Sequence, residues 1–479
     1  SLSFTRFSTF PRFALIILVT SQLTLCNTID NEVDQCSLPD DLITEIESYA
    51  PTVNQIINET VNGLFKGTTW QELAAFVDKF GPRLAGSQVL EDAIDYMLNN
   101  SINHGLENVH GEYAVVPHWI RGAESATLLQ PRIKDMAMLG LGYSVGTPSE
   151  GITASAIVVK SFEELRLRQN EVLGKIVVYN QDYVNYGETV EYRSRGASEA
   201  ARFGAVAVLI RSITPNSIYS PHTGMMSYQK NVTKIPAACI TVEDATLLNR
   251  MADRGDGLVI NIKMGAQTLP PVNSRNTIAE ISGAQMAEKV VVVSGHLDSW
   301  DVGQGAMDDG GGAFISWNAL RILKALNLRP RRTIRAILWT GEEFGILGAH
   351  QYIQAHQAEK SNLQFVLESD IGTFTPLGLA FTGSKEVRCI LQKIMSLLGA
   401  INATNITSPQ EGPDITEWVN SGVPGASLWN ENSKYFWYHH SNGDTMLVED
   451  PHALDLGTAL FAAVSYVMAE LSVDLPQHK

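Results

Sequence analysis

Three apolar runs in the second half of the chain each end on acidic or imidazole side chains. The runs and the groups that follow them are residues 289–295 with His296 and Asp298, residues 333–339 with Glu342 and Glu343, and residues 363–367 with Asp370. Residues 290–293 form an unbroken β-branched run, as expected of a strand buried on both faces of a parallel sheet. Because the carboxyl ends of parallel strands share one crevice, the sequence predicts that these distant residues form a single polar cluster.

Helical patterns separate these strands. Apolar residues recur at helical spacing over residues 313–326, until Pro330 stops the helix, and a second helix is predicted at 346–353. This alternation is typical of βαβ units, so we predict an α/β fold around a largely parallel, mixed sheet. Near the N-terminus, helices are predicted at residues 41–63, with an interruption near Pro51, and at residues 70–80.

The predicted cluster combines carboxylates with an imidazole, a ligand set suited to zinc. A single acid at a strand end is more often a solvated loop residue, but several in one sheet favour a metal site. A hydrolytic site with two metals needs a bridging ligand, and Asp308 is placed to bridge because the glycines after it permit a tight turn. Asp298, two residues after His296 in an extended segment, can orient that imidazole.

Two pairs of adjacent residues leave alternatives open. The side chains of Glu342 and Glu343 diverge at a strand end, so one should bind metal while the other reaches the attacking water as general base. A further ligand is expected from the loop after residues 425–429, where His439 and His440 are neighbours. His440 is the better candidate, but spacing alone does not choose between the two histidines.

The motifs around these residues resemble those of the co-catalytic zinc exopeptidases of the aminopeptidase/glutamate carboxypeptidase superfamily. The resemblance is carried by residues 294–310, 425–428 and 435–440, and it extends over nearly the whole chain after the leader. It implies two zinc ions per subunit. The ligands that it implies are His296, Asp308 as the bridge, Glu343, Asp370 and His440.

The resemblance also assigns roles outside the ligand set. It implies that Glu342 is the general base and that Asp298 is the carboxylate that orients the histidine. It favours His440 over His439, because the last family motif continues from the histidine to an Asp-Thr pair, here Asp444 and Thr445. It further implies a cis peptide bond between Asp308 and Asp309.

The organisation changes between about residues 117 and 273. Short apolar strands are predicted there at 156–159, 175–179, 206–210, 235–242 and 258–264, with a small-residue helix at 198–203 and no acidic cluster. This stretch resembles the protease-associated domain inserted in related peptidases. We therefore predict a peptidase domain of residues 46–116 and 274–479, and an inserted α/β domain at 117–273. The inserted domain either narrows access to the crevice or only stabilises the fold or a dimer.

Residues 1–26 have the pattern of a secretory signal peptide. Arg6 and Arg12 come before the apolar stretch 13–25, which is shorter than the about 20 residues of a membrane span. A signal anchor is the alternative, and no other segment is predicted to cross a membrane. The resemblance suggests a propeptide at 27–45, as in a zymogen. The chain is expected to be secreted or lysosomal, or to lie in the endoplasmic reticulum or Golgi. Glycosylation sequons agree with this route and occur at Asn58, Asn99, Asn231, Asn402 and Asn405.

Charge and cysteine usage narrow the function further. The net charge of −16, from 35 basic and 51 acidic residues, argues against nucleic acid as a partner. If Cys26 leaves with the leader, three cysteines remain, so at least one cannot join an intramolecular disulfide. We predict that the protein is a zinc-dependent exopeptidase acting on dipeptides or short peptides with free termini. The resemblance also implies that it forms a homodimer.

Three alternatives accompany this prediction. They are a folate-hydrolase-like glutamate carboxypeptidase, an aminopeptidase, and a non-catalytic receptor on the same scaffold. The receptor is disfavoured because the full ligand set and the candidate base are present in the sequence.

Overall fold

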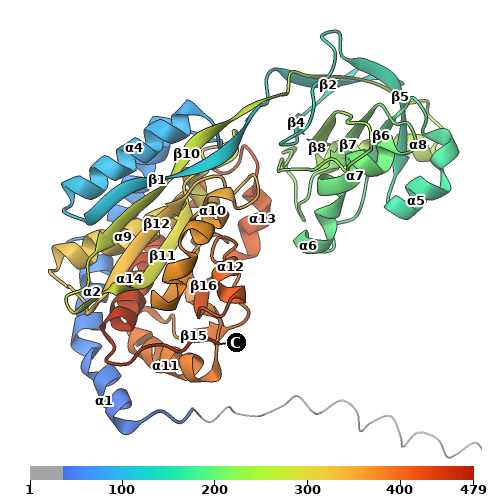
Figure 1. Cartoon of the computed structure of the whole chain (residues 1–479). Coiled ribbons are helices and arrows are strands. Elements are labelled where there is room, and N and C mark those ends of the chain that lie inside the picture. The colour runs from blue at the N-terminus through green and yellow to red at the C-terminus, as the bar shows by residue number, and fades with distance from the viewer. Residues whose placement is uncertain (1–35, 479) are drawn as a thin grey trace, which may run out of the picture. The chain divides into compact units, whose positions relative to one another are not determined.

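The computed structural model in Figure 1 describes residues 36–478. The predicted signal peptide and the first part of the predicted propeptide lie outside these residues. The described chain begins with the helices α1 (Asp40–Ser48), α2 (Ala50–Val61), α3 (Thr68–Phe80) and α4 (Gln88–Asn103). Pro51 lies in the first turn of α2, where its missing N–H costs no helical hydrogen bond, so the predicted interruption separates α1 from α2.

The first sheet has eight strands and is mixed, as predicted. In spatial order the strands are β1 (Glu107–Ile120), β10 (Gln267–Ile281), β12 (Arg332–Trp339), β11 (Met286–His296), β13 (Leu363–Glu368), β16 (Gly425–Asn430), β14 (Pro376–Thr382) and β15 (Asn405–Thr407). The central strands β12, β11, β13 and β16 run parallel to one another, whereas β10 and β14 are antiparallel to their neighbours in this group. The carboxyl ends of the parallel strands therefore meet at one edge.

The β-branched run in β11 is buried on both faces of the sheet. Val291 and Val293 belong to a core shared with α9 (Gly311–Ala325) and α14 (Pro451–Glu470). Val290 and Val292 pack on the other face, in a core shared with α10 (Leu347–Ala355) and α12 (Thr416–Asn420). Helices therefore cover both faces of the sheet, which confirms the predicted α/β architecture (Figure 1).

Helix α14 corrects the prediction that no segment after the leader could cross a membrane. Pro451–Glu470 is long and apolar enough to do so by length and composition alone. In the structure 89% of the apolar stretch of this helix is buried, and the helix packs against α9, α2 and the first sheet. Its composition is that of a helix surrounded by protein, which a count of apolar residues does not distinguish from a membrane span.

A second sheet, also of eight strands, lies between β1 and β10 in the chain. Its spatial order is β3 (Lys134–Met136), β2 (Glu124–Gln130), β9 (Val259–Met264), β5 (Ile152–Val159), β6 (Ile176–Tyr179), β7 (Ala207–Arg211), β8 (Ala237–Ile240) and β4 (Met138–Gly140). The strands β5 to β8 are parallel, and β8 carries the free, buried Cys239. Two cores of its own pack on its faces, with α8 (Val242–Asp253) on one and α7 (Glu191–Ala201) on the other.

Helix α7 begins earlier than the helix predicted at 198–203. Its first turns carry Glu191, Arg193 and Arg195, and this polar sequence gives no apolar periodicity to mark a helix. The apolar pattern appears only where Ala197 and Ala200 pack on the sheet.

The long strands β1 and β10 join the two sheets. They pair antiparallel from Glu107↔Glu280 to Ile120↔Gln267, and Figure 1 shows them running out from the first sheet toward the second. The predicted domain limits at 116/117 and 273/274 fall within this ladder, where Val116 pairs with Val272. Prolines and half-exposed positions break the apolar pattern of both strands, so the sequence did not indicate them.

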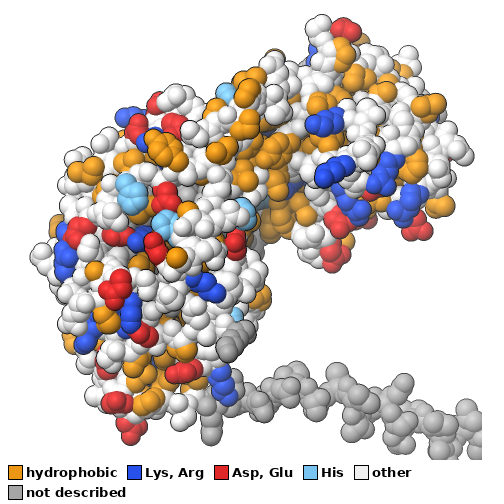
Figure 2. Space-filling model, in the orientation of Figure 1, with side chains coloured by type: hydrophobic (Ala, Val, Ile, Leu, Met, Phe, Trp, Pro, Cys, Tyr) orange, Lys and Arg blue, Asp and Glu red, His pale blue; other side chains and the backbone are white. Residues whose placement is uncertain are grey.

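Basic side chains on the surface around the second sheet lie next to acidic ones. Figure 2 shows Lys and Arg side chains gathered on the lobe at the right of the view, with Asp and Glu beside them. Arg168, which ends helix α5 (Phe162–Leu167), pairs with Glu164 and Glu171 at 3.1 and 2.9 Å. In α7, Arg195 pairs with Glu191 at 2.6 Å.

Close packing of α9 on the sheet depends on glycines. A Cβ atom at Gly312 would lie 2.0 Å from the carbonyl oxygen of Ser369, and one at Gly295 would lie 2.5 Å from the amide nitrogen of Ala313. The helix therefore begins in direct contact with the ends of β11 and β13. The turn that carries Asp308 is held against the sheet for the same reason.

We expect Gly312→Ala to destabilise the protein by about 1–3 kcal/mol, because the added methyl group meets fixed backbone. The matched control is Gly399→Ala, where an added Cβ meets nothing within 4 Å. The midpoint of thermal unfolding should fall for Gly312→Ala and stay near that of the unchanged protein for the control. Equal midpoints for both variants would contradict the close approach.

Candidate metal centre

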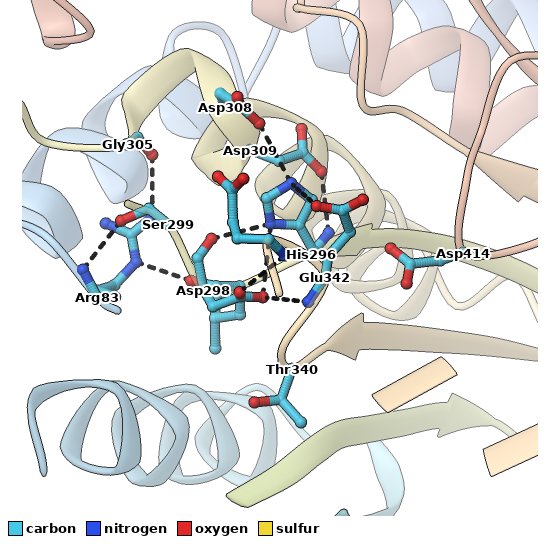
Figure 3. A network of polar contacts seen from close by, with 12 residues as sticks. Arg83, His296, Asp298, Ser299, Gly305, Asp308, Asp309, Thr340, Glu342 and Asp414 are labelled. Carbon is cyan, nitrogen blue, oxygen red and sulfur yellow. Dashed lines mark hydrogen bonds and ion pairs between the residues drawn. The ribbon is translucent and has the colours of Figure 1, made fainter. Parts of the chain in front are cut away.

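The predicted cluster forms at the carboxyl edge of the central strands. His296 is the last residue of β11, and Asp370 lies two residues beyond β13. The Nε2 atom of His296 lies 3.2 Å from Asp308 Oδ1 and 3.1 Å from Asp370 Oδ1. Figure 3 shows Asp308, Asp309 and Glu342 gathered around the His296 ring. Residues more than 70 positions apart in the sequence thus share one site.

A second group of side chains meets the other oxygen of Asp308. His440 Nε2 lies 3.3 Å from Asp308 Oδ2 and 3.0 Å from Glu343 Oε2. The Asp308 carboxylate therefore lies between His296 and His440, with one oxygen toward each. This is the position expected of a ligand that serves two ions.

Both adjacent histidines face the cluster. His439 Nε2 lies 3.6 Å from Asp308 Oδ2, and its ring stacks on that of His440 with centroids 3.5 Å apart. His440 contacts two of the predicted ligands, whereas His439 contacts one at a longer distance. The geometry favours His440 as the ligand, as the family motif implied.

The residues present fit a divalent cation. Among the described residues, Asp308 Oδ2, Glu343 Oε1 and Asp370 Oδ1 are buried oxygens that accept no hydrogen bond, although imidazole nitrogens lie within 3.3 Å of Asp308 Oδ2 and Asp370 Oδ1. Three overlapping groups of ligand atoms, each within 4.8 Å of one another, are built from His296, Asp308, Asp309, Glu343, Asp370, His439 and His440. Buried carboxylate oxygens that lack donors are costly unless a cation compensates them.

The raised pKa values of three of the clustered acids point the same way. Burial raises the pKa of Glu343 to about 7, and the nearby Asp308 carboxylate adds to this rise. Burial is also the largest cause of the raised pKa of Glu342 and of Asp370. Carboxylates that are hard to ionise together become stable anions when positive charge is placed between them.

The structure distinguishes Glu342 from Glu343. The Glu343 side chain is 3% exposed and contacts His440, whereas the Glu342 side chain is 17% exposed and its nearest ring nitrogen, His296 Nε2, is 3.8 Å away. Glu343 therefore lies inside the cluster and Glu342 at its open side. This placement suits a ligand and a group that meets substrate, respectively.

Asp298 acts on more than the histidine. The Nδ1 atom of His296 contacts the backbone carbonyl of Asp298 at 2.9 Å, while the Asp298 carboxylate is 3.6 Å from the same nitrogen. That carboxylate instead accepts hydrogen bonds from the backbone N–H groups of Glu342 at 3.1 Å and Glu343 at 3.3 Å. Asp298 thus holds the His296 ring with its carbonyl and the glutamate loop with its side chain.

Two further acids support the cluster and were given no role in the sequence analysis. Asp309, joined to Asp308 by a cis peptide bond, accepts from the backbone N–H of His296 at 2.9 Å. Asp444 accepts from the backbone N–H groups of Met307 at 2.7 Å and Asp308 at 3.1 Å, and burial raises its pKa to about 7. The Asp-Thr motif marked Asp444, but nothing in its spacing indicated which amides it would bind.

Arg83 ties the loops behind the cluster together (Figure 3). Its guanidinium donates to the carbonyl oxygens of Leu297 at 2.8 Å, Gln304 at 2.7 Å and Gly305 at 2.9 Å. Burial lowers its pKa to about 10. The sequence gave no reason to expect that Arg83 contacts residues more than 200 positions away.

The region between β1 and β10, which forms the second sheet, also contributes to the centre. The carbonyl oxygen of Thr223 lies 3.1 Å from His440 Nδ1, and the Thr223 N–H donates to the His440 carbonyl at 2.9 Å. His222 Nδ1 contacts the carbonyl oxygen of His439. The orientation of His440 is therefore fixed from outside the first sheet, which no sequence pattern indicated.

A pocket of about 300 Å³ opens onto the cluster. Its lining includes Asp308, Glu342, Glu343, Asp370, Glu411, His439, His440, Tyr186, Arg193, Met225, Tyr435 and Phe436. Residues from the first-sheet region and from the second-sheet region therefore border the same pocket. A ligand in this pocket would lie against Glu342 and the oxygens of Asp308.

Comparisons with known proteins find relatives over most of this chain. The profile of Peptidase family M28 matches residues 276–465. Carboxypeptidase Q of Homo sapiens is 56% identical over 433 residues, covering 90% of this chain and 92% of the relative. The crystal structure of a peptidase M28 precursor from Shewanella amazonensis superposes with a TM-score of 0.86 at 32% identity, covering 91% of this chain and all of that one. A zinc aminopeptidase from Bacillus subtilis, 18% identical with a TM-score of 0.64 and covering 86% of this chain and 99% of its own, shares the fold.

Asp444→Ala should weaken zinc binding by about 10- to 100-fold, because the amides that hold the Asp308 turn lose their acceptor. A competition titration with a chelating dye measures this affinity. Asp450→Ala is the matched control, since Asp450 accepts from the backbone N–H of Ala453 at the start of α14. Equal zinc affinity in both variants would show that Asp444 does not position the centre.

Proposed function

Because this chain belongs to the carboxypeptidase Q family within peptidase family M28, we propose that it is a zinc-dependent exopeptidase acting on dipeptides or short peptides. The observation that carries the proposal is that His296 and His440 each lie within 3.3 Å of one oxygen of Asp308, while each also contacts one further predicted ligand. His296 and Asp370 form one group, and Glu343 and His440 form the other. We assign these five residues as the ligands of two zinc ions per subunit.

The chain's own residues supply the proton transfers. Zinc, when bound, supplies Lewis acidity to the attacking water and to the carbonyl of the scissile peptide bond. Glu342 accepts a proton from that water and returns it to the leaving amine, because its carboxylate lies at the open side of the cluster. Asp298 holds the Glu342 backbone and the His296 ring, so it positions both groups without touching substrate.

The pocket suits a small peptide. Its volume of about 300 Å³ lies at the lower end for ligand sites, and Tyr186, Phe436 and Met225 supply apolar walls. Short substrates with free ends would fill this space, whereas a chain continuing in both directions would need an open groove. This supports an exopeptidase.

We also propose the cellular setting that the sequence suggested. All five sequon asparagines are exposed, as glycosylation requires. Passage through the secretory pathway to the lysosome or the outside, removal of a propeptide near residues 27–45, and homodimer formation complete the proposal.

Hydrolysis of a dipeptide panel tests the function. The purified protein should cleave dipeptides with free ends, lose activity in a chelator and regain it with added zinc. Blocking the amino end or the carboxyl end of each substrate shows which terminus is required. A preference for a free amino end with a blocked carboxyl end would favour an aminopeptidase. Absence of hydrolysis by zinc-loaded protein would favour the receptor.

Glu342→Gln should retain zinc while turnover falls by about 10²–10⁴, because the amide keeps the shape but cannot accept a proton. Glu343→Gln should instead lower the zinc content. Glu411→Gln is the matched control, since Glu411 lines the same pocket outside the cluster. Zinc content and turnover are measured for all three variants. Near-normal turnover of fully loaded Glu342→Gln would place the base on another residue.

A further inference from the structure

A second pocket adjoins the one that opens onto the predicted metal cluster. This adjoining pocket has a volume of about 400 Å³, and its lining includes Tyr143, Ser194, Met225, Ser227, Tyr228 and Lys234. Among the described residues, Met225 is the one lining residue that it shares with the pocket of about 300 Å³ over the cluster, here called the metal pocket. The Met225 side chain therefore lies between two spaces, of which the proposed function uses one.

The rest of the wall is the loop of residues 342–346. Glu342, Glu343 and Gly345 border the metal pocket. On the other side of the loop, Tyr143 of the adjoining pocket donates its hydroxyl to the carbonyl oxygen of Phe344 at 3.1 Å, and the two rings pack edge-on with centroids 4.9 Å apart. A Cβ atom added to Gly345 would lie 3.9 Å from both Sδ and Cε of Met225. The methionine side chain thus closes against this loop.

The backbone of Met225 is fixed, whereas its side chain is half-exposed. Its carbonyl oxygen accepts from Arg193 Nε at 3.2 Å, and Met225 forms an isolated β-bridge with Gly142. The next residue, Met226, is 1% exposed, but Met225 is 38% exposed. Methionine is unbranched and adapts its shape to irregular spaces. The backbone therefore sets where the barrier between the pockets lies, and the length of the side chain sets how far it extends.

The chemistry of the adjoining pocket favours an apolar side chain. Tyr143 and Tyr228 supply aromatic walls, and their hydroxyls already donate to the carbonyl oxygens of Phe344 and Ile235. Lys234 places its Nζ atom 5.6 Å from the centre of the Tyr228 ring, so the same space carries a positive charge. Such walls suit an aromatic or apolar side chain and disfavour a basic one.

We propose that Met225 closes one end of the substrate pocket and limits how far a peptide extends on that side. The adjoining pocket is then a subsite for one further residue, which becomes accessible when the side chain at 225 is shortened. The inference rests on the proposed exopeptidase function and deepens it, because it names the residue that restricts substrate length. A further residue advances the peptide by about 3.8 Å and would overlap the methionine side chain.

The test compares a dipeptide with two tripeptides, made by adding phenylalanine to its amino end or to its carboxyl end. In the zinc-loaded wild-type enzyme, kcat/KM for at least one tripeptide should be about 10-fold or more below that for the dipeptide. Met225→Ala should raise kcat/KM for that tripeptide, relative to the dipeptide, by about 10-fold or more. Met225→Leu keeps the volume of the side chain and should keep the wild-type ratio.

Two further measurements locate the added residue. Combining Met225→Ala with Ser227→Trp should remove the gain, because Ser227 lines the adjoining pocket and not the metal pocket. Lysine in place of the added phenylalanine should gain less. Leu129→Ala is the matched control, since Leu129 is 36% exposed and lines neither pocket, and it should keep the wild-type ratio. Zinc content and thermal midpoint are measured for every variant.

Three outcomes would overturn the proposal. A wild-type enzyme that cleaves the dipeptide and both tripeptides equally well has no length limit at Met225. An unchanged ratio in folded, zinc-loaded Met225→Ala would show that the side chain is no barrier. A gain that survives Ser227→Trp, or that is equal for lysine and phenylalanine, would place the added residue outside the adjoining pocket. Failure of the proposed function is distinct, because the zinc-loaded wild-type protein then does not cleave even the dipeptide.

Discussion

Repulsion between carboxylates that share one buried crevice is the constraint on which the rest of this structure depends. Asp308, Glu343 and Asp370 are all less than 10% exposed and face a common centre with His296 and His440. Such a centre is stable only if positive charge occupies it and if the backbone cannot move the oxygens apart. The parallel sheet answers the second requirement, because the strand ends are fixed relative to one another by the hydrogen bonds of the sheet.

A second set of acids fixes the loops that follow the strands and carry the predicted ligands. Asp298, Asp309 and Asp444 each accept hydrogen bonds from backbone amides of segments that carry predicted ligands. Arg83 donates to the carbonyl groups of the adjoining loops and adds positive charge behind the cluster. The site therefore has an inner group of side chains facing the pocket and an outer group facing the backbone. Mutation of the outer group would change the inner one without touching any ligand.

The sequence was informative where chemistry and strand order coincide. The β-branched run at 290–293 predicted a central strand, and the acids after three such runs predicted the cluster. The outer group was largely missed, since the carboxylates of Asp309 and Asp444 bind amides that only the folded turn brings near. The carboxylate of Asp298 was expected on His296 and lies mainly on the glutamate loop. β1 and β10 were missed because prolines and half-exposed residues hide their alternation, and the domain limits were placed inside them.

The hydrogen bonds between Thr223 and His440 couple metal binding at the first sheet to the packing of a segment that belongs to the second-sheet region. The Nε2 atom of His440 faces the metal cluster, while its Nδ1 atom contacts the carbonyl oxygen of Thr223 in the second-sheet region. Whatever free energy an ion gains from that orientation, the docking of the His222–Thr223 segment gains from the ion by the same amount. Occupancy of the centre and closure of this contact are thus linked equilibria. The Thr223 amide donates to the His440 carbonyl, so its hydrogen-exchange rate should report whether the metal site is occupied.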